Sequence, residues 1–254
     1  SLSFFADTQI WGKDRPWGYH LTNVLIHSTV GALVFLFLLR FTSSVPLAMV
    51  GALFYALHPV QSDAIASVNG RGTPLSGLFV MLAFLLYPKR IWLAGIALLL
   101  AMYSKETAVP FIAALFVYDR LLDPKSPISF QTLFPKFLPF ALAILIYFVT
   151  RFAVLGGLGS VIEGDTTKGF YTLQNRLWIQ PQQIAEYLKM IFIPLDLHAA
   201  RQMYFPTNFF EPAYFFPFLA FLGIVFMAAI SFKYSKKAFF VLLLALLFLT
   251  PVLN

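Results

Sequence analysis

The stretch LFYALHPVQSDAIASVNGRGTPLS, from Leu53 to Ser76, decides the fold of this chain. It leaves one apolar segment, stays polar for about four helical turns, and then enters another apolar segment. Pro59 suits the first turn of a helix, where its missing N–H is no loss, and Gly70 suits the end. We therefore predict a short helix that connects two membrane segments.

The predicted connecting helix has two different sides. Apolar residues recur four positions apart, at Val60, Ala64 and Val68. A second row with the same spacing is more polar, namely Asp63, Ser67 and Arg71. A helix of this kind lies flat on a membrane surface. We expect four side chains to face the boundary between water and lipid: His58, Asp63, Asn69 and Arg71.

The composition is that of a membrane protein. Of 254 residues, 59% are hydrophobic and 11% are charged, and the mean hydropathy is +0.79. A soluble domain carries about 25% charged residues, so this chain cannot cover a water-facing surface. The absence of cysteine excludes disulfide bonds and cysteine-ligated metals. The net charge of +7 comes without a basic run or an RNA-binding motif, so we expect no nucleic-acid partner.

Eight apolar segments predict an all-α, polytopic helix bundle. They are Leu21–Leu39, Val45–Leu57, Leu75–Tyr87, Ile91–Tyr103, Thr107–Leu122, Phe134–Phe152, Tyr214–Phe232 and Ala238–Val252. Some are shorter than the roughly 20 residues that span a bilayer, and they gain length from flanking Ser, Thr and Tyr. We expect a single transmembrane domain over residues 1–254, with a further helix and a first outer loop before Ser1.

The charges predict the orientation. If the segments alternate, one side receives nine cations and only two acids, Asp119 and Asp123. The cations are Arg40, Lys89, Arg90, Arg120, Lys125, Lys136, Lys233, Lys236 and Lys237. Such an excess of Lys and Arg marks the cytosolic side. We therefore place the 53–76 stretch, both chain ends and the long connection 155–213 outside, with a second surface helix over Leu177–Ile193.

Three polar residues share one face of the first apolar segment, His20, Asn23 and His27. They either hydrogen-bond within the bundle, where polar groups need partners, or contact a phosphate or a sugar. A metal site is the weakest interpretation, because the usual zinc spacings and a nearby carboxylate are missing.

Ionisable residues at outer helix ends are further candidates. Lys105 and Glu106 interrupt apolar sequence, and Arg151 lies near the end of a Phe-rich segment. Such groups bind ligands at membrane depth, but they also pair with each other or extend to the interface. An Arg there can bind a lipid phosphate through two hydrogen bonds. His198 and Arg201 are weaker candidates in the long connection.

Motifs of soluble enzymes are absent, since the sequence has no GxxxxGK[ST], GxSxG, HExxH or dinucleotide-binding pattern. What remains is a set of residues on the predicted outer side: Asp63, Arg71, Lys105, Glu106 and Arg151, beside His58. Cations at the outer leaflet suit a phosphorylated lipid, and a carboxylate there could act as a base toward a hydroxyl group.

Several motifs resemble, in order and spacing, the membrane region of the transmembrane and TPR-repeat-containing O-mannosyltransferases and their bacterial relatives. They are WGYHLTNVLIH (Trp17–His27), ALHPVQSDAIASVNGR (Ala56–Arg71), SKETAV (Ser104–Val109), VYD (Val117–Asp119), YLKMIFIPLDL (Tyr187–Leu197) and TPVLN (Thr250–Asn254). The resemblance implies a C-type glycosyltransferase fold, with the active site on the extracytosolic face and a TPR domain after the membrane region.

The resemblance also implies a reaction. Such enzymes transfer a sugar, here a mannose-like hexose, from a polyprenyl-phosphate carrier to the hydroxyl group of a protein or glycan acceptor. We expect no cofactor other than a divalent metal, and membrane lipids as partners. The charge pattern fits a bacterial inner membrane, which we favour, and equally the endoplasmic reticulum of a eukaryote.

The sequence departs from the family pattern at several positions. The family's acidic base lies in a loop before Ser1, and Asp7 is too late in that loop, so the catalytic base is unassigned. Asp63 stands where relatives have Glu, Ser67 where they have Trp, and Thr73 where they have an acid.

Judged by their positions in the matching motifs, the best counterparts of the family's functional residues are Arg71, Lys105 and Glu106. We expect a set of cations, with His58, to hold the carrier phosphate: Arg71, Lys105 and Arg151. Asp63 or Glu106 would orient the acceptor or a metal. The departures keep a second interpretation open, a non-catalytic membrane subunit or scaffold that retains the fold and binds other membrane subunits. A transporter is less supported, because no inverted repeat is visible.

Overall fold

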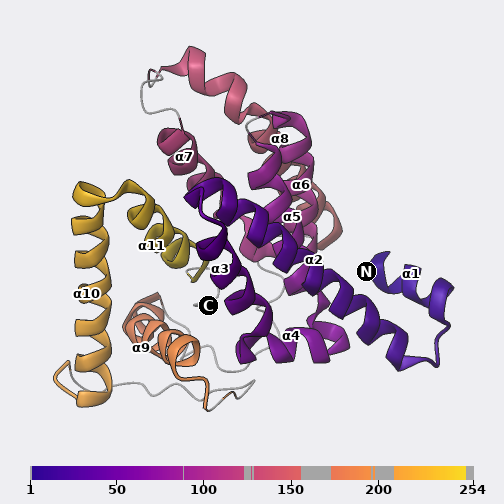
Figure 1. The fold of residues 1–254 in the computed structure, drawn as a ribbon, viewed down its shortest axis with the longest axis horizontal. Coiled ribbons are helices and arrows are strands. Elements are labelled where there is room, and N and C mark those ends of the chain that lie inside the picture. The colour runs from indigo at the N-terminus through magenta and orange to yellow at the C-terminus, as the bar shows by residue number, and fades with distance from the viewer. Residues whose placement is uncertain are drawn as a thin grey trace. The chain divides into compact units, whose positions relative to one another are not determined.

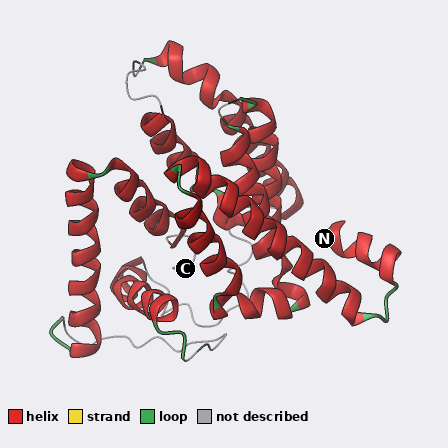
Figure 2. Cartoon of the chain, viewed as in Figure 1, coloured by secondary structure: helices red, strands yellow, loops and turns green. Residues whose placement is uncertain are grey.

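The computed structural model describes residues 2–87, 89–122, 127, 129–155, 173–195, 197 and 209–249. Within these ranges every regular element is a helix (Figure 1 and Figure 2), which confirms the all-α prediction. The weaker candidates His198 and Arg201, and both chain ends, lie outside the described residues.

Each predicted apolar segment overlaps a helix, although residues 250–252 of the last one lie outside the described residues. The α-helices are α1 Leu2–Trp11, α2 Pro16–Thr42, α3 Val45–Leu57, α4 Ser62–Ala66, α5 Gly72–Leu86, α6 Ile91–Ser104, α7 Phe111–Leu122, α8 Phe130–Leu155, α9 Leu173–Phe192, α10 Pro212–Tyr234 and α11 Lys236–Leu249. Three 3-10 helices join them: η1 Pro59–Gln61, η2 Val68–Arg71 and η3 Glu106–Ala108.

The chain forms two compact units. The first comprises residues 1–108 and 134–145, and the second comprises 109–133 and 146–254. Two of the boundaries therefore fall inside α8, of which residues 134–145 belong to the first unit. The prediction of a single transmembrane domain stays a prediction.

The first unit is built around α2 and α5. Helix α2 packs against both α3 and α5, and α5 packs against α6. Many of the buried side chains in these helices are small or aromatic: Ala48, Ala83, Ala94, Ala97, Ala101, Phe37 and Phe84. Small side chains let helix backbones approach closely, which favours association where lipid replaces water.

The stretch between α3 and α5 is not the continuous helix that we predicted. It consists of η1, α4 and η2, with an extended residue, Ser67, between the last two (φ −78°, ψ 124°). Pro59 does begin the first piece, and the chain bends by 45° between α3 and Pro59–Ala66. The break has a cause in α2, because Asn23 Nδ2 donates to the carbonyl oxygens of Ile65 and Ser67.

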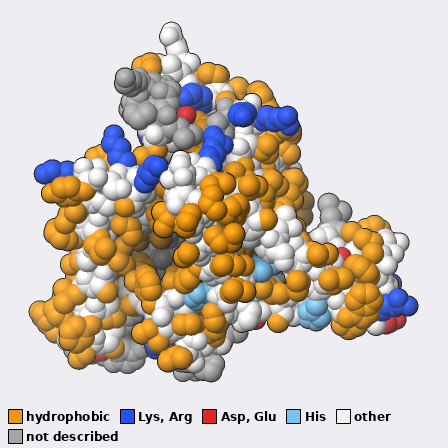
Figure 3. All heavy atoms as spheres, in the orientation of Figure 1, with side chains coloured by type: hydrophobic (Ala, Val, Ile, Leu, Met, Phe, Trp, Pro, Cys, Tyr) orange, Lys and Arg blue, Asp and Glu red, His pale blue; other side chains and the backbone are white. Residues whose placement is uncertain are grey.

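Three helices are long and apolar enough to cross a membrane, namely α2, α8 over Phe130–Val154, and α10. The bent pair of α3 with Pro59–Ala66 raises this number to four within the described residues. The other apolar helices have 12 to 15 residues, so eight spans stay a prediction. Hydrophobic side chains cover much of the surface in Figure 3, as expected for a protein that faces lipid.

Some of the predicted cytosolic cations lie near one another within each unit. In the first unit, Arg40 Nη1 donates to the carbonyl oxygen of Leu85, so the end of α2 lies beside the end of α5, just before Lys89. In the second unit, Tyr118 of α7 stacks on Phe240 of α11 with ring centroids 5.6 Å apart. This contact brings the end of α7, with Arg120, near the start of α11 and its lysines.

The second unit contains the other predicted surface helix. Helix α9 covers the predicted range Leu177–Ile193 up to Phe192 and continues through Pro181. Its residue Ile184 is buried, and Leu188 is half-buried. Helix α9 packs against α10, which also contacts α11.

We predict that Gly95→Ala destabilises the first unit. A Cβ at this position of α6 would lie 2.9 Å from Pro139 Cβ and 3.0 Å from the Pro139 carbonyl oxygen, so the backbones must move apart. The expected loss in free energy of unfolding is about 1–3 kcal/mol, measured by denaturant titration in detergent.

Gly223→Ala in α10 is the matched control, because nothing lies within 4 Å of its Cβ position. The control should be neutral or slightly stabilising, by at most about 1 kcal/mol. Equal losses in the two variants would contradict the close approach.

Candidate functional site: a buried arginine beside an accessible lysine

Arg71 is the last residue of η2 and directly precedes α5. Although we expected it to face the water–lipid boundary, it is fully buried, so that expectation was wrong. Its Nη2 atom lies 2.5 Å from Asp7 Oδ2, and its Nε donates to Asn23 Oδ1 at 2.6 Å. Both partner side chains are buried as well. The charge pair is therefore shielded from water, and salt weakens it less than an exposed pair.

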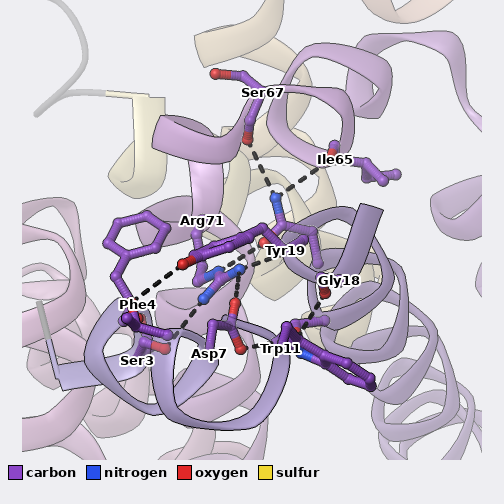
Figure 4. A network of polar contacts seen from close by, with 12 residues as sticks. Ser3, Phe4, Asp7, Trp11, Gly18, Tyr19, Ile65, Ser67 and Arg71 are labelled. Carbon is purple, nitrogen blue, oxygen red and sulfur yellow. Dashed lines mark hydrogen bonds and ion pairs between the residues drawn. The ribbon is translucent and has the colours of Figure 1, made fainter. Parts of the chain in front are cut away.

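Further contacts complete the surroundings of the guanidinium (Figure 4). Its Nη1 donates to the carbonyl oxygen of Ser3 at 3.2 Å, and Nη2 donates to that of Tyr19 at 3.0 Å. The ring of Phe4 lies 4.5 Å from the guanidinium carbon, which adds a cation–π contact. Arg71 thus joins three parts of the chain: α1, the start of α2, and η2.

Asp7 is held from its other side by α2. Thr22 Oγ1 donates to Asp7 Oδ1 at 2.9 Å and accepts from Trp11 Nε1 at 3.2 Å. The Trp11 ring occupies the space above Gly18, where a Cβ would come within 2.4 Å of it. The sequence analysis excluded Asp7 as the catalytic base and did not predict that it pairs with Arg71. The signal available was a single acid in a mostly apolar helix, which requires a partner once buried.

Asn23 and His27 use their polar atoms within the bundle. Asn23 accepts from Arg71 and donates to two carbonyl oxygens of the α4–η2 segment. His27 Nε2 lies 3.1 Å from the Ala56 carbonyl oxygen, and its ring stacks on Tyr55. The prediction that these residues hydrogen-bond inside the bundle is therefore confirmed for Asn23 and His27. His20 is half-buried.

Lys105 lies close to this network but remains accessible. Its Nζ donates to the Thr73 hydroxyl at 2.9 Å, and Thr73 is exposed. The two segments meet tightly, because a Cβ on Gly72 would lie 2.8 Å from the Ser104 carbonyl oxygen. Arg71, Gly72, Thr73 and Lys105 therefore form one continuous group of residues.

The remaining candidates have separate surroundings. His58 caps η1, since its Nδ1 accepts from the Val60 N–H at 3.2 Å. Asp63 in α4 and Glu106 in η3 are exposed. Arg151 belongs to the second unit, where its Nη1 donates to the Tyr147 hydroxyl at 2.9 Å.

The divalent metal stays a prediction. Among the residues that the structure describes, no three His, Asp or Glu side chains come close enough together to hold an ion.

The sequence is similar to several known proteins. The chain is 33% identical over 132 residues to the protein O-mannosyl-transferase tmtc2 of Xenopus laevis, matching 47% of this chain. It is 32% identical over 146 residues to Tmtc2 of Drosophila melanogaster (52% of this chain), and 37% identical over 101 residues to human TMTC4 (35% of this chain). The resemblance to the O-mannosyltransferase family is confirmed.

The matches cover only part of these relatives. The matched part spans 16% of the length of the first two proteins and 14% of the third. No family model matches the chain, and no solved structure does either.

We predict that Arg71→Ala strongly destabilises the first unit. The substitution leaves the Asp7 carboxylate buried without its partner and removes the contacts to Asn23, Ser3 and Tyr19. Removing one member of a buried ion pair costs about 3–5 kcal/mol, to be measured as free energy of unfolding in detergent.

Arg15→Ala is the matched control, because Arg15 is an exposed arginine in the turn between α1 and α2. Its effect should stay within about 0.5 kcal/mol. A loss below about 1 kcal/mol for Arg71→Ala would show that the buried network contributes little.

Proposed function

We propose that this protein is a membrane glycosyltransferase that moves a mannose-like hexose from a polyprenyl-phosphate carrier to a hydroxyl acceptor. The observation that carries the proposal is the similarity to proteins named protein O-mannosyl-transferase. Those names also support a protein acceptor and a sugar donor. The proposal concerns the whole protein, because the matched part spans a small share of the relatives.

Lys105 provides the contact to the donor phosphate in this proposal. An ammonium group has three N–H donors, and in the described part of the chain Nζ donates to one partner, the Thr73 hydroxyl. The Thr73 hydroxyl accepts from Lys105, so its own proton can be donated to a phosphate oxygen. A hydrogen bond between an ammonium and a phosphate is charge-assisted and roughly twice as strong as a neutral one.

The other candidates keep their proposed roles near the phosphate and the acceptor. Within the first unit, His58 would add a contact to the carrier, and Asp63 or Glu106 would orient the acceptor hydroxyl. The base that takes the acceptor proton is not assigned within this chain.

The proposed site faces the extracytosolic side. Support comes from the grouping of cations at the opposite helix ends, such as Arg40 beside Leu85. Because the relatives named above come from animals, they favour the endoplasmic reticulum over the bacterial inner membrane that the sequence alone led us to favour.

The activity test uses the full-length protein in detergent with radiolabelled polyprenyl-phosphate mannose or glucose and membrane-derived acceptors. We expect Lys105→Ala to lower transfer by about tenfold or more, the loss of one charge-assisted hydrogen bond. Lys105→Arg should retain more activity, because it keeps the charge. Lys13→Ala is the matched control, since Lys13 is exposed in the turn before α2.

The alternative is a non-catalytic membrane subunit or scaffold that retains the fold. Absence of transfer by the parent protein with either donor, and failure to bind the carrier lipid, would replace the enzyme with this alternative. Full activity of Lys105→Ala would leave the enzyme in place but remove Lys105 from its phosphate site.

The orientation is testable separately, because the chain has no cysteine. Single cysteines at Asp63 and at Lys89, both exposed, should react with a membrane-impermeant maleimide from opposite sides of sealed vesicles. We expect Asp63→Cys to react from the extracytosolic side and Lys89→Cys from the cytosolic side. Labelling of both from the same side would contradict the proposed topology.

A further inference from the structure

We propose that Arg71 is a positioning residue, held by Asp7 and Asn23, that fixes Thr73 and thereby the Lys105 ammonium. Arg71 does not itself bind the phosphate. The inference deepens the proposed function and rests on it for the ligand that Lys105 binds. It gives helix α1 a part in that site without contact to the ligand.

The hydrogen bonds of Arg71 leave little room for a ligand. A guanidinium has five N–H donors. Nε donates to Asn23, Nη1 donates to the Ser3 carbonyl oxygen, and Nη2 contacts both Asp7 and the Tyr19 carbonyl oxygen. The side chain is buried. A phosphate that reached it would have to displace Asp7 and leave that carboxylate buried and unpaired, which is strongly unfavourable.

The path from Arg71 to Lys105 is short. Thr73 is two residues after Arg71 and accepts from Lys105 Nζ at 2.9 Å. Between them Gly72 lies against the Ser104 carbonyl oxygen, where even a Cβ would approach to 2.8 Å. Because this contact joins two backbones, a shift of Arg71 is passed to Thr73 rather than absorbed by a flexible side chain.

Asn23 fixes the same segment from its other end. Its Nδ2 donates to the carbonyl oxygens of Ile65 and Ser67, while its Oδ1 accepts from Arg71 Nε. The residues from Ile65 to Arg71 are therefore held against α2 at both ends. Asp7 supplies the opposite charge from α1, and Thr22 of α2 fixes the second oxygen of its carboxylate.

The decisive variant is Asp7→Asn, because the two possible roles of Arg71 predict opposite signs. If Arg71 were a ligand for the phosphate, removal of its competing carboxylate would free it and strengthen binding. If Arg71 positions Thr73 and Lys105, the same substitution loosens the segment and weakens binding. We expect a loss of threefold or more in affinity, roughly 0.7 kcal/mol or more.

The measurement is binding of polyprenyl phosphate to the full-length protein in nanodiscs, with the neutral polyprenol as the control lipid. We expect Asp7→Asn to weaken binding of the phosphate and to leave binding of the polyprenol unchanged. In a Lys105→Ala background, Asp7→Asn should cause no further loss, since it acts through Lys105. Stronger phosphate binding by Asp7→Asn, or an equal further loss in that background, would overturn the proposal.

Two variants keep the test decisive if Asp7→Asn does not fold. Thr73→Val breaks the contact to Lys105 at an exposed position, and it should weaken phosphate binding as Asp7→Asn would. Thr73→Ser keeps the hydroxyl and should restore binding. Unchanged binding by Thr73→Val would overturn the proposal.

A measurement without ligand separates this inference from the proposed function. In the cysteine-free chain, cysteines at Thr73 and Lys105 should be joined rapidly by a short bis-methanethiosulfonate reagent. Arg71→Lys should slow this reaction several-fold, because Lys keeps the charge but cannot make the same set of hydrogen bonds. If the parent protein does not bind polyprenyl phosphate, the proposed function fails, and the cross-linking rate still supports or overturns the positioning role.

Discussion

A guanidinium without access to water determines the arrangement of the first unit. A buried charge is tolerated only when an opposite charge and hydrogen-bond acceptors surround it. Arg71 obtains its acceptors from Asp7, Asn23 and two backbone carbonyl groups. Meeting this requirement brings α1, the start of α2 and η2 together. Helix α5 begins directly after η2 and packs against α6.

The same requirement explains why irregular backbone is stable between α3 and α5. Non-helical backbone near a membrane needs partners from the protein for its N–H and C=O groups. Asn23 supplies them at Ile65 and Ser67, His27 lies within reach of the Ala56 carbonyl oxygen, and His58 caps η1. The side chains of Asn23 and His27 in α2 therefore make hydrogen bonds in place of those that a continuous helix would have made.

The sequence predicted the helices well and the chemistry of Arg71 poorly, for different physical reasons. Apolar runs specify helices locally, so each predicted segment was found. The prediction of a polar row with Asp63, Ser67 and Arg71 assumed one unbroken helix. No local pattern shows that Asn23 donates hydrogen bonds to the carbonyl oxygens of Ile65 and Ser67.

The partner of Arg71 was equally hidden from pattern analysis. Asp7 lies in a different helix and far away in the sequence, so only the folded chain reveals the pair. Asn23 and His27 were interpreted correctly, because polar side chains in an apolar helix have to find partners wherever the fold places them.

The distance in sequence between Asp7 and Arg71 also has a consequence for the order of assembly. A chain that is made from its N-terminus presents α1 and α2 before η2 and α5 exist. Until Arg71 has been made, the Asp7 carboxylate lacks the cation that it pairs with in the folded chain, and burying it unpaired is unfavourable. We therefore expect α1 to dock late, by a contact between residues far apart in the sequence that needs η2 to be present.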